Sequence, residues 1–140
     1  MKACILLGRI RFEEKEFLKS IRNSKVPFDI LDPRKEEFPK TKKELLATVQ
    51  QYNVVFNFYR NHSIGLNLID TINKNLDIPT INPSKLERNC WDKRTSYEIF
   101  MKNNIPIPET IITSTNSEIK DAVEKVGYPA VMKDPFGSRG

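Results

Sequence analysis

Two lysines and a glycine-rich stretch are the residues of this sequence best suited to hold a phosphate group. The last thirteen residues read YPAVMKDPFGSRG, in which Lys133 follows a run typical of a buried strand and Gly137 and Gly140 bracket a polar turn. Glycines let the backbone approach closely, so its N–H groups and an ammonium can surround a polyphosphate. Taken alone, a hairpin turn beside an exposed lysine is the better interpretation, because the stretch matches neither the P-loop pattern nor G-x-G-x-x-G.

A second lysine favours the phosphate interpretation. Lys93 lies in the segment DKRTS, near the start of an expected helix and about forty residues before Lys133. Asp92 is placed to cap that helix. The linker NNIPIPET separates the two lysines, and its prolines mark a break between structural units.

Four further polar residues follow expected strands. Arg9 and Arg11 come after the first strand, and Arg60 and Ser63 come after the third. The carboxyl ends of parallel strands share one edge of an open sheet, where such sheets bind ligands. These residues are therefore candidates for contact with an acidic substrate or carrier. A solvated loop for the arginines and a helix cap for Ser63 are the alternatives.

No pattern in the sequence predicts a metal site or a catalytic residue. His62, the single histidine, has no cysteine or serine partner at a telling position, and Cys4 and Cys90 form no CxxC pair. Both cysteines are expected to be buried free thiols.

The elements that would position these residues alternate between strands and helices. Branched apolar runs at residues 3–7, 28–31, 53–58 and 78–82 predict strands, and segments of helical period beginning at residues 12, 41 and 63 lie between them. This order predicts an α/β fold with an open, mostly parallel, Rossmann-like sheet.

The organisation changes near residue 88. A helix is expected within residues 90–104, a strand at Thr110–Ile112 and a closing strand at Tyr128–Met132. Between these strands the spacing of the apolar residues predicts an amphipathic helix that ends at Gly127, with a face formed by Ile119, Ala122, Val123 and Val126. We therefore predict a domain at residues 1–88, a connecting helix and linker at 89–108, and the first strand, helix and strand of a second domain at 109–140.

Charge and hydropathy exclude several classes of partner. The net charge is +5, but lysine and arginine alternate with acids, as in RKEEFPKTKKE, which is typical of a solvated surface. No basic stripe is interleaved with aromatics, so nucleic acid is not an expected partner. The apolar runs are far shorter than the ~20 residues of a membrane span, and the amino terminus lacks a signal peptide. We expect a cytoplasmic protein.

Three motifs in order resemble those of the ATP-grasp ligases. They are WDKRTS, NIPIPET and GYPAVMKDPFGSRG, and the similar branch contains the RimK-like ligases and the lysine-biosynthesis enzyme that joins 2-aminoadipate to a carrier protein. The resemblance extends over the whole chain through GRIRFEEKEFLKS, YRNHS and IPTINPSKLERNCWDK. Two residues depart from the family pattern: Gly8 replaces the usual aspartate and Asp134 the usual proline.

The resemblance implies a pre-ATP-grasp domain followed by the start of an ATP-grasp domain, with ATP and Mg²⁺ as cofactors. In such enzymes a carboxylate attacks ATP to give an acyl phosphate, and an amine then displaces the phosphate. Lys93 and Lys133 match the two ATP-contacting lysines. The loop over the phosphates begins with Gly137, Ser138, Arg139 and Gly140. The resemblance also implies an amino acid substrate, an acidic carrier protein as a possible partner, and a possible homo-oligomer.

The magnesium ligands and catalytic arginines of that family are expected beyond residue 140. We therefore expect an amino-terminal fragment of a ligase that is inactive by itself. One alternative is a stand-alone flavodoxin-like domain that binds a ligand or protein at Arg9, Arg11 and Arg60. Another is a truncated product whose first domain only dimerises.

Overall fold

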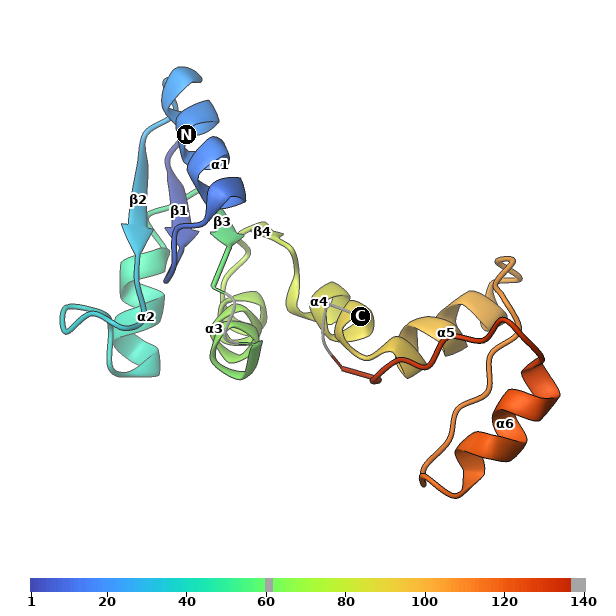
Figure 1. The fold of residues 1–140 in the computed structure, drawn as a ribbon. Coiled ribbons are helices and arrows are strands. Elements are labelled where there is room, and N and C mark those ends of the chain that lie inside the picture. Colours follow the sequence, from blue (N-terminus) through green and yellow to red (C-terminus); the bar gives the residue numbers. More distant parts are fainter. Residues whose placement is uncertain (60–61, 137–140) are drawn as a thin grey trace. The chain divides into compact units, whose positions relative to one another are not determined.

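A parallel β-sheet forms the centre of the first part of the chain (Figure 1). The computed structural model describes residues 1–59 and 62–136. Within them, four strands run parallel in the order β2-β1-β3-β4: β1 (Ala3–Leu6), β2 (Phe28–Leu31), β3 (Val54–Asn57) and β4 (Thr80–Ile81). In the register, Ile5 lies between Ile30 and Phe56. The predicted open parallel α/β sheet is confirmed.

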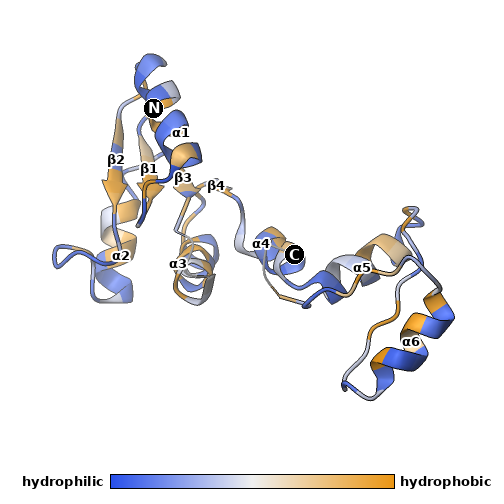
Figure 2. Ribbon diagram, in the orientation of Figure 1, coloured by the Kyte–Doolittle hydropathy of each residue, from blue (hydrophilic) through white to orange (hydrophobic). Residues whose placement is uncertain are grey.

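Helices cover both faces of β1, which has no exposed residue. Ala3, Ile5 and Leu7 pack on one face with residues of α1 (Phe12–Asn23). Cys4 and Leu6 point to the opposite face, where residues of α2 (Lys42–Val49) and α3 (His62–Asn75) complete the core. Figure 2 shows the resulting concentration of hydrophobic residues in the strands. A central parallel strand has this uninterrupted apolar sequence because neither face meets water.

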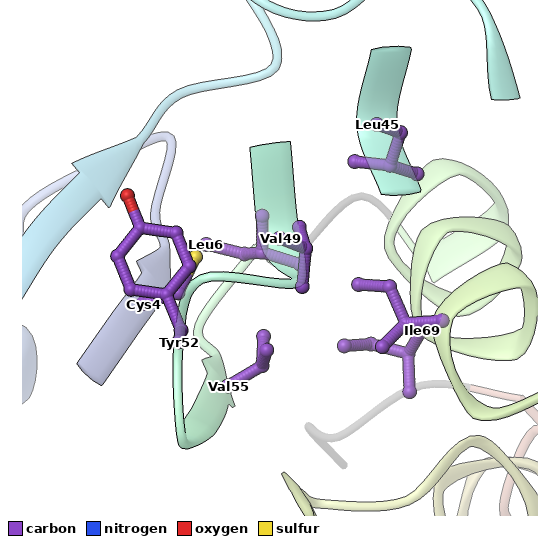
Figure 3. Close-up of a cluster of buried hydrophobic side chains, with 8 residues drawn as sticks. Cys4, Leu6, Leu45, Val49, Tyr52, Val55 and Ile69 are labelled. Carbon is purple, nitrogen blue, oxygen red and sulfur yellow. The ribbon is translucent and has the colours of Figure 1, made fainter. Parts of the chain in front are cut away.

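A cluster of buried hydrophobic side chains lies beneath α2 and α3 (Figure 3). Its members are fully or almost fully buried and comprise Cys4, Leu6, Leu45, Val49, Tyr52, Val55, Ile69 and Ile72. Burying one aliphatic side chain of this size stabilises a fold by about 1.5–3 kcal/mol. Burial also raises the pKa of the Cys4 thiol to about 12, so this thiol stays protonated. Cys4 is buried as predicted, but Cys90 is exposed, which corrects the expectation for that residue.

Local hydrogen bonds explain where two of these helices begin. At α2, Thr41 Oγ1 accepts the N–H of Glu44 at 3.2 Å, and the Glu44 carboxylate accepts the N–H of Thr41 at 3.3 Å. This reciprocal capping box satisfies N–H groups that the helix cannot pair internally. At α1, the buried Glu14 carboxylate accepts the N–H of Arg11 at 2.8 Å.

Ser63 does not cap α3. This helix begins at His62, so Ser63 lies in its first turn, which corrects the alternative assignment of Ser63 as the residue before the helix.

The chain divides into two compact units, Met1–Glu87 and Arg88–Gly140. Helix α4 (Ser84–Trp91) spans the division, and α5 (Lys93–Lys102) and α6 (Glu118–Val126) follow it. The predicted amphipathic helix at α6 is confirmed: its half-buried residues are Ile119, Ala122, Val123 and Val126, and Gly127 ends it with φ of 81°. No helix of the described residues is both long and apolar enough to cross a lipid bilayer.

Neither predicted strand of the second unit forms. Residues 110–112 and 128–132 have no strand assignment in the described structure. Tyr128, Val131 and Met132 are 86%, 78% and 76% exposed, whereas the sequence predicted a buried strand. Apolar, branched composition favours a strand only where a neighbouring strand accepts its hydrogen bonds and its side chains find cover. Among the described residues of this unit, strand pairing is limited to one bridge between Asp92 and Phe136.

A polar cluster ties β2 to the segment between α2 and β3. Asp29 accepts a hydrogen bond from the Tyr52 hydroxyl at 2.6 Å and pairs with the Lys2 ammonium at 2.7 Å. Lys2 Nζ also lies 5.1 Å from the centroid of the Tyr52 ring. Hydrogen bonds from Lys2 and then Tyr52 hold the pKa of Asp29 below its usual value of 3.8.

We predict that Asp29→Asn lowers the free energy of unfolding more near pH 7 than near pH 2. A carboxyl group with a lowered folded-state pKa stabilises the protein above its ordinary pKa and loses that contribution as the pH falls through the lowered value. Urea unfolding at both pH values measures the difference. Glu16→Gln, which removes an exposed carboxylate 3.8 Å from Lys19, is the control and should show little pH dependence. An Asp29→Asn effect equal at both pH values would contradict the assignment.

A second prediction concerns Gly65 in the first turns of α3. A Cβ atom at this position would lie 2.6 Å from the backbone oxygen of Tyr59. Gly→Ala inside a helix ordinarily stabilises by about 0.5–1 kcal/mol. Because of the overlap, we expect Gly65→Ala instead to lower the free energy of unfolding by about 1–3 kcal/mol. The exposed Asn67→Ala on the same helix should stay within about 0.5 kcal/mol. Urea unfolding compares them, and a stabilised Gly65→Ala would refute the close approach.

Candidate functional site

The first turn of α5 and the segment Lys133–Phe136 lie against each other. The backbone N–H of Lys93 donates to the Pro135 carbonyl oxygen at 2.9 Å, and Lys93 Nζ donates to the Asp134 carbonyl oxygen at 2.8 Å. Lys93 is half-buried, whereas Lys133 is exposed. The structure thus joins the two lysine-bearing motifs that the sequence shows forty residues apart, within a single compact unit.

Asp92 and Arg94 hold this contact in place. Asp92 caps α5 by accepting the N–H of Arg94 at 2.9 Å, and its two carboxylate oxygens accept the Arg94 side chain at 3.0 Å (Nε) and 2.7 Å (Nη2). These bonds from Arg94 keep the pKa of Asp92 below its usual value. The Arg94 guanidinium lies 5.2 Å from the Phe136 ring centroid, a distance suited to a cation–π interaction. The sequence predicted the Asp92 cap but gave no sign of Arg94 and Phe136.

Asp134 has a local structural role. Its Oδ1 accepts the N–H of Phe136 at 2.9 Å, which closes a short turn after Lys133. That turn directs the carbonyl groups of Asp134 and Pro135 toward Lys93. The acid that departs from the family pattern therefore shapes the segment beside the two lysines.

The other candidate residues have the following positions. Arg9 and Arg11 are exposed in the loop between β1 and α1, and Ser63 is exposed in the first turn of α3. Arg60 and the glycine-rich segment, Gly137, Ser138, Arg139 and Gly140, lie outside the described residues. The described candidates in the first unit thus follow the carboxyl ends of β1 and β3.

Two polar residues that the sequence did not single out lie near the end of β3. Asn57 Nδ2 donates to both carboxylate oxygens of Glu87, at 2.9 and 3.1 Å, and Asn57 Oδ1 accepts the N–H of Tyr59 at 3.2 Å. Burial raises the pKa of Glu87, and the Asn57 hydrogen bond opposes that rise. A partly desolvated carboxylate is therefore fixed to the carboxyl end of β3. Only the fold reveals it, because thirty residues separate the partners in sequence.

Two further features of the described residues bear on function: their possible metal ligands and a hollow between α2 and α3. In residues 1–59 and 62–136, no three His, Cys, Asp or Glu side chains are grouped so that they could hold a metal ion. A hollow of about 300 Å³ opens between α2 and α3, with Leu45, Ile64 and Leu68 in its lining and Lys40 and Lys42 among its polar residues. Its lining offers apolar contact without an acid, base or nucleophile arranged for chemistry.

Comparison with known proteins connects this geometry to ATP-grasp proteins. No protein-family model matches the chain. A solved RimK-domain ATP-grasp protein from Sphaerobacter thermophilus superimposes with a TM-score of 0.69 at 17% identity, over 99% of this chain and 50% of that one. The fold is therefore an ATP-grasp fold over about half the length of that protein.

The sequence relatives are more specific. The glutamate–LysW ligase ArgX of Sulfurisphaera tokodaii is 27% identical over 100% of this chain and 48% of its own length, and the ArgX of Sulfolobus acidocaldarius is 25% identical with the same coverage. The α-aminoadipate–LysW ligase LysX of S. tokodaii is 25% identical over 97% of this chain and 47% of its own length. The homologues of this chain are thus LysW ligases, and the resemblance inferred from the motifs is confirmed. The chain spans about half the length of these curated relatives.

We predict that Phe136→Leu loosens the contact between α5 and Lys133–Phe136. Leucine keeps apolar bulk but lacks the aromatic face that receives Arg94, an interaction worth roughly 0.5–1 kcal/mol at an exposed site. Amide hydrogen exchange at Lys93, whose N–H donates to Pro135, should therefore become roughly two- to five-fold faster.

Lys120→Ala on α6 is the matched control and should leave exchange at Lys93 unchanged. If Phe136→Leu also leaves that exchange rate unchanged, the ring does not support the contact.

Proposed function

We propose that these 140 residues form the amino-terminal part of an ATP-dependent carboxylate–amine ligase and supply part of its nucleotide site. The observation that carries the proposal is the contact between the start of α5 and Lys133–Phe136, which brings together the motifs of Lys93 and Lys133. The homology to LysW ligases and the ATP-grasp fold support it.

The donor set fits the phosphate groups of ATP. Lysine ammoniums form short, charge-assisted bonds to phosphate oxygens. The bond from Lys93 Nζ to the Asp134 carbonyl fixes the direction of one ammonium, and the turn at Asp134 positions the backbone that carries Lys133. We propose that both lysines neutralise phosphate charge and that Gly137, Ser138, Arg139 and Gly140 continue the site over the phosphates. Bound ATP would supply the phosphoryl group that activates the substrate carboxylate.

In this proposal, the residues that bind the acidic substrate belong to the first unit. Arg9, Arg11, Arg60 and Ser63 would contact an acidic amino acid, since three are cationic and all four follow β1 or β3 in the sequence. Open parallel sheets bind ligands at their carboxyl edge. The relatives' names join glutamate or α-aminoadipate to LysW, so a dicarboxylic amino acid and a LysW-like carrier protein are the proposed substrates.

The described residues group no set of magnesium ligands, so we assign Mg²⁺ to none of them. For the same reason we expect the 140 residues alone to bind nucleotide without joining substrates.

We predict that Lys93→Met and Lys133→Met each weaken ATP binding by roughly ten-fold or more, because a hydrogen bond to a charged group contributes about 1.5–3 kcal/mol. Isothermal titration calorimetry on the full chain measures the dissociation constant. Lys125→Met removes a lysine from the last turn of α6 and should leave it unchanged.

A second variant separates binding from folding. Lys93→Gln keeps a hydrogen-bond donor for the Asp134 carbonyl and removes the charge, so the exchange protection of Lys93 should persist while ATP affinity falls. ATP affinities that are equal in all variants would refute the two-lysine site. A chain that binds no ATP would favour the flavodoxin-like alternative.

A further inference from the structure

Gly8, Arg34 and Tyr59 come together where β1 ends. Gly8 is buried and follows β1 by two residues. A Cβ atom on Gly8 would lie 2.5 and 2.7 Å from Cε2 and Cδ2 of the Tyr59 ring, and 3.4 Å from Nε of Arg34. The missing side chain therefore allows an aromatic ring and a guanidinium to approach the backbone of Gly8 directly. A side chain at position 8 would have to displace the Tyr59 ring from this place.

Asp32 fixes the orientation of Arg34. The Asp32 carboxylate accepts Nε at 2.9 Å, Nη2 at 2.7 Å and the backbone N–H of Arg34 at 3.0 Å. The Asp32 side chain is 10% exposed, whereas that of Arg34 is 57% exposed. Burial raises the pKa of Asp32, but the bonds from Arg34 outweigh this and leave it below 3.8, so the carboxylate is ionised at neutral pH. A largely buried acid thus holds a cation that is itself more than half exposed.

Hydrogen-bond donors remain available to a ligand where Gly8 and Arg34 meet. A guanidinium carries five N–H donors in a plane, and Asp32 engages only those of the Nε–Nη2 edge. Within the described residues, Nη1 of Arg34 and the backbone N–H of Gly8 donate to no protein group. A buried N–H without a partner is uncommon in native proteins, because leaving it unpaired costs free energy.

The charge around these donors favours an anion. Asp32 offsets the charge of Arg34, and two further cationic residues, Arg9 and Arg11, follow Gly8 in the exposed loop. A planar guanidinium edge matches the two oxygens of a carboxylate better than a point charge does. The carboxyl end of an open parallel sheet is also where ligands enter such folds.

We propose that Arg34, oriented by Asp32, binds a ligand carboxylate beside the backbone N–H of Gly8, with the Tyr59 ring as the wall of the site. Arg34 is the binding residue and Asp32 the positioning residue. The ligand class is a small carboxylic acid such as a dicarboxylic amino acid. The choice of that acid rests on the proposed ligase function, whereas the site itself depends only on contacts within the first unit.

Nuclear magnetic resonance titration of the full chain tests the site. L-glutamate, glutarate and inorganic phosphate are the probes, at constant ionic strength. The Gly8 amide and the Arg34 Nε–H should shift with saturation for glutamate and glutarate. Phosphate should produce shifts that do not saturate over the same range. Saturation by phosphate alone would identify an anion site of different chemistry and overturn the carboxylate assignment.

Variants separate geometry from charge. Arg34→Lys keeps the charge but loses the planar fork, so glutamate should bind at least ten-fold more weakly. Lys35→Gln removes a neighbouring exposed charge that pairs with Glu37 at 3.4 Å, and should change affinity less than two-fold. Equal losses in the two variants would show unspecific charge attraction and overturn the proposal.

Asp32→Asn tests the positioning role. We expect weaker glutamate binding together with a changed Arg34 Nε–H resonance in the unliganded protein, which a merely structural role for Asp32 would not produce. An unchanged resonance and affinity would exclude that role. Arg34→Lys should leave ATP affinity unaltered. If the protein binds carboxylates but not ATP, only the proposed ligase function is refuted. If it binds ATP but not carboxylates, only this site is refuted.

Discussion

The burial of β1 on both faces is the constraint on which the first unit depends. Each of its residues is 0–1% exposed, so helices must pack on either side of the strand. Parallel neighbours on both edges, β2 and β3, follow because the helices act as crossovers that return the chain to the same end of the sheet. One consequence is chemical: the loops after β1, β2 and β3 all begin at the same edge. The packing of a hydrophobic strand thus brings Gly8, Arg34 and Tyr59 together.

The second unit has a different basis. No residue of α5 or α6 is buried, and large apolar side chains such as Met101, Tyr128 and Val131 are more than half exposed. Its characteristic contact is polar, formed by the Asp92–Arg94 pair and the bonds from Lys93 to Asp134 and Pro135. A unit with few buried apolar contacts opens locally at low free-energy cost. The geometry around the two lysines therefore depends on a small number of hydrogen bonds.

Local conformation in both units was predictable where short-range chemistry decides it. The Asp92 cap and the helix end at Gly127 depend on neighbouring residues and appear as predicted. The α6 face is also correct, because helical spacing alone sets which residues share a side. The strands at residues 110–112 and 128–132 were wrong because composition cannot supply the partner strand that such a segment requires. Ser63 was expected at the cap of α3 but lies inside the helix, which begins at His62.

The sequence by itself determined the α/β alternation, the parallel sheet, the family resemblance and the two lysines, because periodicity, turn residues and ordered motifs are local or linear properties. The tertiary structure alone decided that Arg34 and Tyr59 meet at Gly8, that Glu87 binds Asn57, and that Arg94 stacks on Phe136. These partners lie 26 to 51 residues apart in the sequence. They become neighbours only when the chain folds and the end of one strand comes to lie beside another. Long-range packing of this kind depends on how buried strands and helices stack, and no spacing in the sequence encodes it.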